Sequence, residues 1–152
     1  MRLLAIGAAL TAFAMPAFAE GDADAGHSQF GRQCVSCHRV QNDEGEVLAG
    51  RNGRTGPNLY HMPFGQAGHF DGFRYSDAME QWGQAGGVWD EEAFVSFVMN
   101  PTNHLREVTG NARARSKMAY QVRDEQHARD IFAFLVSLNP EATAISEAAA
   151  AE

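Results

Sequence analysis

The C-terminal third of the chain carries the clearest periodic pattern of apolar residues. Four of them recur at positions i, i+3, i+4 and i+7: Ile131, Phe134, Leu135 and Leu138. This spacing places all four on one face of a helix. The pattern starts at Asp124, a favourable N-terminal cap, and stops at Asn139-Pro140. It predicts a helix over residues 124–138.

Three weaker patterns predict shorter helices. Residues 90–100 begin with acidic side chains and then place Phe94, Phe97 and Val98 on one face, with Pro101 closing the segment. Residues 75–85 form a second short segment that ends near a glycine pair. Residues 21–33 begin with Asp22 and contain Gly26 and Phe30. A glycine inside a helix is unfavourable by about 1 kcal/mol relative to alanine, which suggests close approach of another helix.

The remaining segments lack a regular pattern. Residues 40–53 are rich in turn-forming residues, residues 60–72 are irregular, and residues 102–117 are polar with little periodicity. No stretch alternates convincingly enough to predict a strand. We therefore expect an all-α fold of three to five short helices joined by long loops. The end of the chain, residues 140–152, is rich in Ala and Glu, and we expect a flexible tail.

The N-terminus has the composition of an export signal. Arg2 precedes an uncharged apolar run over residues 3–15, and Ala17-Phe18-Ala19 matches a small-residue cleavage site. We predict a signal peptide over residues 1–19 and one domain over residues 20–139. A retained anchor is the alternative, but the run is short for a bilayer span. Export from a bacterial cell would place the mature protein in the periplasm, without membrane insertion.

Composition narrows the choice of function. The chain has 152 residues and a net charge of −7, which argues against binding nucleic acid. It has only two cysteines, so a disulfide framework does not hold the fold together. Basic residues nevertheless gather between positions 105 and 123, where Arg113, Arg115 and Lys117 precede Met118.

Both cysteines lie in the sequence Cys34-Val35-Ser36-Cys37-His38. The pattern C-x-x-C-H is the attachment motif of c-type haem. Each cysteine can form a thioether with one vinyl group, and the adjacent His38 can ligate the iron. One covalently attached haem c would also supply the apolar core on which the long loops pack.

Other functions of a C-x-x-C pair fit less well. A zinc site requires two further ligands at suitable spacing, and the other histidines are scattered singly. A thioredoxin-like redox pair requires a βαβ setting that the pattern does not predict. A small disulfide loop is the third alternative. The export signal favours haem.

A second iron ligand decides whether the haem site is closed or open. Four methionines follow the signal segment: Met62, Met79, Met99 and Met118. Met79 and Met99 fall in predicted helices, where a packing role is more common. Spacing alone favours Met118 over Met62 only modestly. On the other side of the ring, the Pro57 carbonyl is a candidate acceptor for the second ring nitrogen of His38, since iron-ligating histidines usually have such a partner.

Beyond the haem motif, an ordered series of short stretches resembles class I cytochromes c, and most closely the bacterial cytochrome c2 group. The stretches span about 120 residues: Gly26-x-x-x-Phe30, 34–38, 55–60, 73–78, 88–92, 100–102, 116–118 and 131–135. The resemblance implies a class I cytochrome c fold wrapped around the haem. It also implies that Gly26 and Phe30 pack against Phe134 where the first and last helices cross.

The resemblance further implies roles for individual residues. It makes Met118 the sixth ligand, through sulfur, and Pro57 the acceptor for His38. Tyr75 and Trp89 resemble residues that hydrogen-bond a haem propionate, and Arg54 a base that pairs with one. Phe97 occupies a position where the family usually has Tyr, so the hydroxyl near the methionine sulfur is missing. The chain also has a single lysine, although lysines often ring the haem edge in this group.

The predicted function is a soluble, periplasmic, mono-haem electron carrier, not an enzyme, that acts as a monomer. A membrane cytochrome bc-type complex would be the donor, and a photosynthetic reaction centre, an oxidase or a reductase the acceptor. Docking would be transient and electrostatic, near Arg113, Arg115 and Lys117. The alternative is a haem protein with an open sixth site that acts as a peroxidase or gas binder. A tethered respiratory subunit is a third possibility, disfavoured by the lack of an anchor.

Overall fold

The computed structural model describes residues 21–51, 53–70 and 72–151. The predicted signal peptide therefore lies outside the described residues. The described chain forms six helices and one two-stranded sheet, in the order α1 (Ala23–Gln33), β1 (Arg39–Gln41), β2 (Val47–Gly50), α2 (Asp77–Gln84), α3 (Glu91–Met99), α4 (Pro101–Thr109), α5 (Glu125–Ser137) and α6 (Pro140–Ala150). No described helix is long and apolar enough to cross a membrane.

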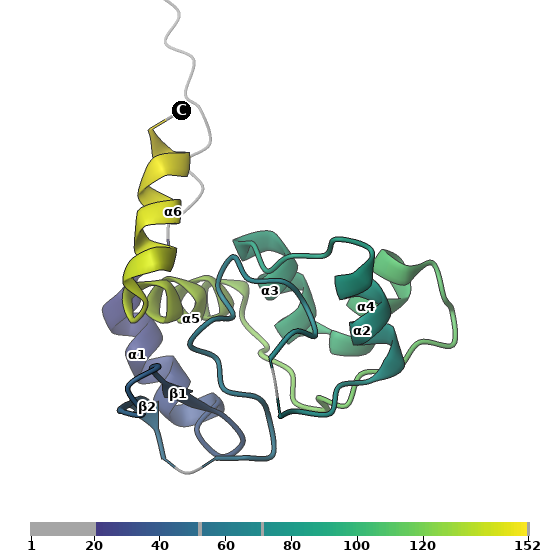
Figure 1. Cartoon of the computed structure of the whole chain (residues 1–152), viewed down its shortest axis with the longest axis horizontal. Helices are drawn as coiled ribbons and strands as arrows, with labels where there is room; N and C mark the ends of the chain where they lie inside the picture. Colours follow the sequence, from purple (N-terminus) through teal and green to yellow (C-terminus); the bar gives the residue numbers. More distant parts are fainter. Residues whose placement is uncertain (1–20, 52, 71, 152) are drawn as a thin grey trace, which may run out of the picture.

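The two helices from opposite ends of the domain, α1 and α5, pack across each other (Figure 1). Phe30 is 1 % exposed at this crossing, and its ring lies 5.6 Å from that of Phe134. A methyl group on Gly26 would overlap the carbonyl oxygen of Asp130. The expected helix crossing is therefore confirmed, and the glycine allows the two backbones to approach.

Side-chain capping sets where the helices begin. Asp22, Ser76, Asp90, Asn100, Asp124 and Asn139 each accept a hydrogen bond from a backbone N–H in the first turn of the helix that follows. These caps satisfy N–H groups that have no partner within the helix. They account for the agreement between the predicted starts of α1, α3 and α5 and the observed ones.

The prediction of a loop over residues 102–117 is wrong in its first half. Asn100 ends α3 and also caps α4, with Pro101 in the first turn. Proline stops a preceding helix, but its fixed φ also suits the first turn of a new one. Helix α4 ends at Thr109 and is capped by Gly110, whose φ of 64° is favourable for glycine.

Two other segments differ from the prediction. Residues 39–50 form a short antiparallel hairpin, in which the buried residues Val40 and Ala49 are paired. Residues 140–150 form α6, although a flexible tail was expected there. The side-chain amide of Asn139 donates to the Tyr60 carbonyl (2.9 Å), which ties the start of α6 to the domain. Ala142 is its one buried residue, and the helix projects beyond α5 (Figure 1).

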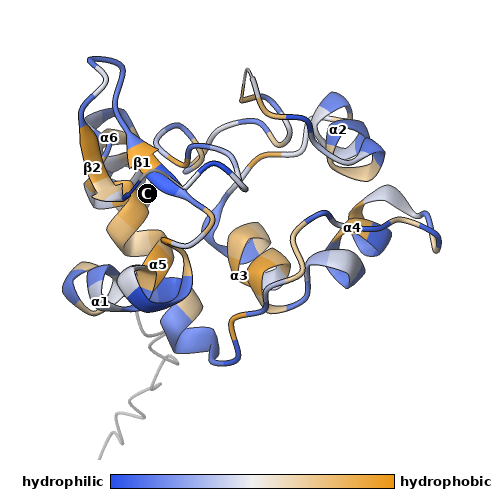
Figure 2. Ribbon diagram, turned by 90° about the horizontal axis from the view of Figure 1, so that it is seen from below, coloured by the Kyte–Doolittle hydropathy of each residue, from blue (hydrophilic) through white to orange (hydrophobic). Residues whose placement is uncertain are grey.

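Apolar residues are concentrated in β2, α3 and α5 (Figure 2). Phe94, Val95, Phe97 and Val98 of α3 are all at most 7 % exposed. Residues of the two long connections, between β2 and α2 and between α4 and α5, line a large cavity.

Candidate haem site

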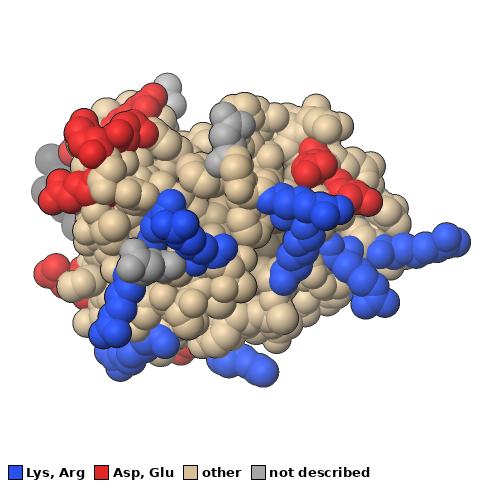
Figure 3. Space-filling model, turned by 60° about the horizontal axis from the view of Figure 1, so that its bottom comes forward, with Lys and Arg blue, Asp and Glu red and all other residues tan. Residues whose placement is uncertain are grey.

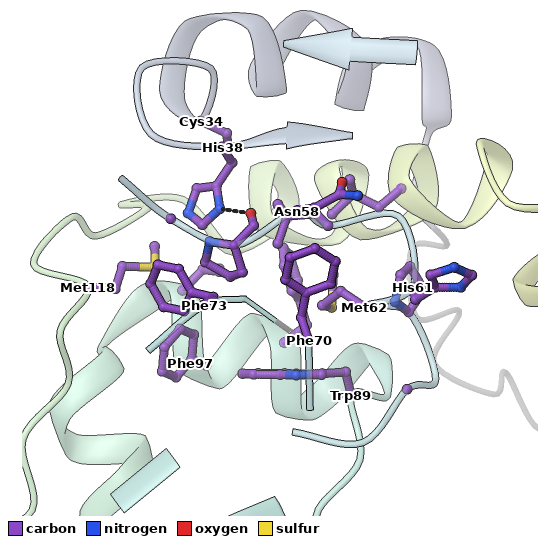
Figure 4. Close-up of a pocket in the computed structure, with 18 of the residues that line it drawn as sticks. Cys34, His38, Asn58, His61, Met62, Phe70, Phe73, Trp89, Phe97 and Met118 are labelled. Carbon is purple, nitrogen blue, oxygen red and sulfur yellow. Dashed lines mark hydrogen bonds between the residues drawn. The ribbon is translucent and has the colours of Figure 1, made fainter. Parts of the chain in front are cut away.

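A cavity of about 780 Å³ lies between the α1 end of the domain and helix α3. Its size falls in the range of cofactor pockets, which are mostly apolar. The cavity brings together most residues that the sequence singled out: Cys34, Cys37, His38, Pro57, Tyr75, Trp89, Phe97 and Met118. Figure 4 shows His38 on one side of the cavity and Trp89 on the other.

The cysteine motif continues directly from α1. The backbone N–H of Cys34 donates to Phe30, and the N–H groups of Cys37 and His38 both donate to the Cys34 carbonyl. This extra turn holds Cys34, Cys37 and His38 at the cavity wall. The motif is therefore presented on the end of a helix that the α5 crossing holds in place.

Neither cysteine forms a disulfide bond. Burial, together with the nearby Cys37, raises the pKa of the Cys34 thiol to about 12. Redox-active C-x-x-C pairs instead have a lowered pKa, because the thiolate is the reactive form. In addition, no cluster of three or more His, Cys, Asp or Glu side chains in the described part of the chain could hold a metal ion. The raised pKa of Cys34 argues against the thioredoxin-like alternative.

The His38 ring is oriented by the turn at residues 55–59. Its Nδ1 lies 3.0 Å from the Pro57 carbonyl oxygen (Figure 4). A carbonyl only accepts, so Nδ1 must carry the hydrogen, and the lone pair of Nε2 is left free for a metal. Burial lowers the pKa of His38, an effect that the hydrogen bond to Pro57 opposes. The neutral imidazole that iron requires is thereby favoured.

Of the four methionines that follow the predicted signal peptide, three line the cavity: Met62, Met79 and Met118. In Figure 4, Met118 lies on the side of Phe73 and Phe97, whereas Met62 lies on the side of His61. The Met118 N–H donates to the Ser116 hydroxyl (3.0 Å), which shapes the loop locally. Met99 does not line the cavity.

The donors expected for a propionate divide into two groups. Tyr75 and Trp89 line the cavity, and Trp89 is 7 % exposed. The Trp89 ring is held by edge contacts with Trp82 and Phe97, at centroid distances of 4.7 and 5.1 Å. Arg54 is exposed and is not among the lining residues. The structure therefore does not bring Arg54 together with the other predicted residues.

The site fits a covalently bound haem c. Two thiols, one imidazole with a free Nε2 and a thioether all face one largely apolar cavity. Thiols can form thioethers with a haem, and imidazole and thioether are the axial ligands of cytochromes c.

Curated relatives point to the same family. Cytochrome c2 of Rhodovulum adriaticum is 55 % identical over 118 residues, covering 78 % of this chain and 93 % of that protein. Cytochrome c2 of Cereibacter sphaeroides is 45 % identical over 131 residues, covering 84 % and 90 %. The chain belongs to the cytochrome c2 family. No family model matches it.

Solved cytochrome c2 structures share the fold. The structure from Rhodobacter sphaeroides superposes with a TM-score of 0.76 at 42 % identity, covering 78 % of this chain and 96 % of that one. Ferric cytochrome c-550 from Paracoccus versutus gives 0.73 at 33 % identity, covering 80 % and 100 %. The predicted class I cytochrome c fold is thus confirmed.

Two features of this cytochrome c2 site were not found from the sequence. A methyl group on Gly56 would overlap the His38 imidazole, so this glycine lets the turn lie flat against the ring. The pair Gly56-Pro57 predicted a turn, but only the fold shows that this turn packs against the His38 ring. His104 is buried on α4, and its ring contacts Trp82, Trp89 and Phe97. An isolated histidine in a polar segment gave no signal of this.

Lys and Arg side chains gather on one face of the molecule, on both sides of a hollow (Figure 3). Arg113, Arg115 and Lys117 are exposed on the segment that leads to Met118. The Lys117 Nζ donates to the Arg74 carbonyl (2.6 Å), so its ammonium is held near the cavity wall. A net-negative cytochrome c2 thus retains a basic face.

Proposed function

We propose that this protein is a periplasmic, mono-haem electron carrier and not an enzyme. One haem c would be attached through Cys34 and Cys37, with His38 and Met118 as axial ligands. The bound iron would supply the chemistry, accepting and releasing one electron between its ferrous and ferric states. The single observation that carries the proposal is the meeting of the C-x-x-C-H motif and Met118 at one apolar cavity.

The protein's own residues would hold the ring and set its electronic environment. Pro57 fixes the tautomer of His38 through its carbonyl, at 3.0 Å from Nδ1. Tyr75 and Trp89 would donate to a propionate. Phe97 presents an apolar ring without a hydroxyl, so it would not donate to the Met118 sulfur. Arg54 would pair with a propionate only after its exposed side chain had moved toward the cavity.

The partners would be membrane electron-transfer complexes. We propose a cytochrome bc-type donor and a photosynthetic reaction centre, an oxidase or a reductase as acceptor. The exposed Arg113, Arg115 and Lys117 would steer an acidic partner toward the cavity. Such complexes are small and short-lived, which suits a carrier that must leave quickly. Cleavage of residues 1–19 would release the carrier, as a monomer, into the periplasm.

A haem protein with an open or labile sixth site is the second candidate. His61 and His69 also line the cavity and would provide polar groups on its wall. His61 is engaged by Asp43, at 2.8 Å from Nε2, and both side chains are exposed. This hydrogen bond with Asp43 draws His61 away from a role in activating a small ligand.

Carbon monoxide distinguishes the two candidates. It would be added to the purified, reduced, haem-loaded protein at neutral pH, with visible absorption as the readout. A closed site held by Met118 should leave the spectrum unchanged over minutes. Rapid and complete binding would overturn the carrier proposal and favour peroxide or gas chemistry.

A further inference from the structure

A hydrogen bond joins two walls of the haem cavity across its rim. The Tyr120 hydroxyl lies 3.0 Å from Oε1 of Gln33, although the two residues are 87 positions apart. Gln33 is the last residue of α1 and precedes Cys34, whereas Tyr120 follows Met118 by two residues. Both residues line the cavity. The bond therefore connects the His38 side of the site to the Met118 side.

The acceptor in this pair is held in a defined orientation. The Gln33 amide nitrogen donates to Oε1 of Gln29, one turn earlier in α1, at 3.0 Å. With its nitrogen engaged, the amide presents its oxygen to Tyr120. The helix therefore offers Tyr120 an acceptor that is already in place before the hydrogen bond forms.

Burial does not explain why Tyr120 occupies this position. The residue is 48 % exposed, so packing in the core does not hold it in place. The hydrogen bond from Tyr120 to Gln33 ties the segment of residues 113–121 to α1. Two other hydrogen bonds of this segment lead elsewhere: the Ser116 N–H donates to the Thr102 hydroxyl (3.3 Å), and the Lys117 ammonium donates to the Arg74 carbonyl (2.6 Å).

We propose that Tyr120 and Gln33 form a latch that keeps the Met118 segment closed over the site. They are positioning residues, because they act on the iron ligand through the loop that carries it. This inference rests on the proposed ligation by Met118. A neutral thioether is displaced by an external ligand only when its loop moves away, so the latch would set how often the sixth position opens.

The expected size of the effect follows from the worth of one hydrogen bond. A partly exposed, neutral hydrogen bond should shift the ratio of closed to open loop by roughly two- to tenfold. Both residues contribute to the same hydrogen bond, so substitution of either one should abolish the whole stabilisation of the closed loop.

Imidazole binding to the ferric, haem-loaded protein measures this opening. At high imidazole concentration the binding rate should level off at the rate at which Met118 leaves. Tyr120→Phe keeps the ring and removes only the hydroxyl, and we expect this limiting rate to rise about two- to tenfold. Gln33→Ala should give a similar rise, and the double variant should give no more than either single one.

Two further variants separate a latch from a general loss of structure. Gln33→Glu retains an acceptor and should keep the parent rate or lower it, since a charged acceptor strengthens the bond. Tyr60→Phe removes a hydroxyl outside the cavity lining and should leave the rate unchanged. Amide exchange of residues 113–121 provides an independent readout and should accelerate in Tyr120→Phe but not in Tyr60→Phe.

The possible results are distinct. The limiting rate of imidazole binding could be the same in the parent, in Tyr120→Phe and in Gln33→Ala. That result would overturn the latch and leave the proposed function intact. Additive effects of the two substitutions would also overturn it, because the residues would then act separately. A parent protein that binds imidazole as fast as Met118→Ala would overturn both the closed site and the latch.

Discussion

The imidazole of His38 hydrogen-bonds the carbonyl of Pro57 and lies against the neighbouring Gly56 of the same turn. Its Nδ1 is 3.0 Å from the Pro57 carbonyl oxygen, and a methyl group on Gly56 would overlap the ring. The Gly56 N–H in turn donates to the Cys37 carbonyl (2.9 Å), which fastens the turn to the motif. One tight turn thus orients the proposed iron ligand and covers its outer face.

The first prediction concerns Gly56→Ala. The added methyl group must displace either the His38 ring or the turn, and overpacking of this kind typically destabilises a protein by about 1–3 kcal/mol. Denaturant unfolding of the haem-loaded protein should show this loss, together with a shift of the haem absorption. Gly31→Ala is the matched control, since nothing lies within 4 Å of the methyl group it adds. Equal stability of the two variants would contradict the proposed packing.

Replacement of Met118 tests the sixth ligand. Met118→Ala should lower the reduction potential and allow carbon monoxide to bind, because a ligand that favours the ferrous state is lost. Met62→Ala is the control, since Met62 also lines the cavity. Potentiometric titration and the carbon monoxide assay measure both effects. If Met62→Ala opened the iron and Met118→Ala did not, the assignment of the ligand would be reversed.

Removing charge from the proposed docking face should slow electron transfer. Arg113→Gln/Arg115→Gln should reduce the association rate with an acidic membrane complex severalfold at low salt, and the difference should shrink as salt rises. Stopped-flow oxidation at several ionic strengths measures this. Arg129→Gln removes a charge on α5 that is already paired with Glu91 and Glu125. A comparable slowing by Arg129→Gln would mean that only net charge matters.

A buried histidine should make stability depend on pH. His104 is 5 % exposed, its Nδ1 lies 3.0 Å from the Ser96 hydroxyl, and its Nε2 is buried without a hydrogen-bond partner. Burial lowers the pKa of His104, while Glu107 and Asp90 oppose that shift. The unfolded chain, with an ordinary histidine pKa, therefore takes up a proton first as the pH falls below about 6.5. The folded state should lose stability over that range.

His104→Phe should reduce this loss. Phenylalanine keeps a ring against Trp82 and Trp89 but removes the buried unpaired nitrogen, so we expect a gain of about 1 kcal/mol at pH 7. The gain should grow as the pH falls toward 5, since only the parent has a proton to take up at this position. Denaturant unfolding at a series of pH values measures both curves. Parallel curves would show that His104 does not contribute to the pH dependence.

The crossing of α1 and α5 gives a prediction about stability alone. Gly26→Ala should destabilise the protein by at least about 2 kcal/mol, because the methyl group meets the Asp130 backbone and cannot be relieved by a rotamer change. Gly31→Ala, in the same helix, should instead be neutral or slightly stabilising, since alanine is the better helix former. Thermal unfolding of the two variants compares them directly. Equal melting temperatures would rule out the close approach.

Local patterns in the sequence predicted most of the helices because their signals lie within a few residues. The apolar spacing over residues 131–138 and the aspartate caps predicted α5, α3 and α1 close to their observed bounds. Helix α4 was missed because Pro101 serves both as the stop of one helix and the start of the next. The hairpin was missed because its strands, with three and four residues, are too short for alternation to show.

The sequence by itself determined the chemistry of the site. Cys34, Cys37 and His38 are joined within five positions, so their spacing, together with the export signal, predicts a covalent haem, and short matching stretches indicated the family. Only the tertiary structure decided which distant residues meet there. Met118, Trp89 and the turn at Gly56-Pro57 reach one cavity, whereas Arg54 does not. The latch of Tyr120 on Gln33 and the burial of His104 also depend on contacts between segments far apart in the chain, which local spacing does not encode.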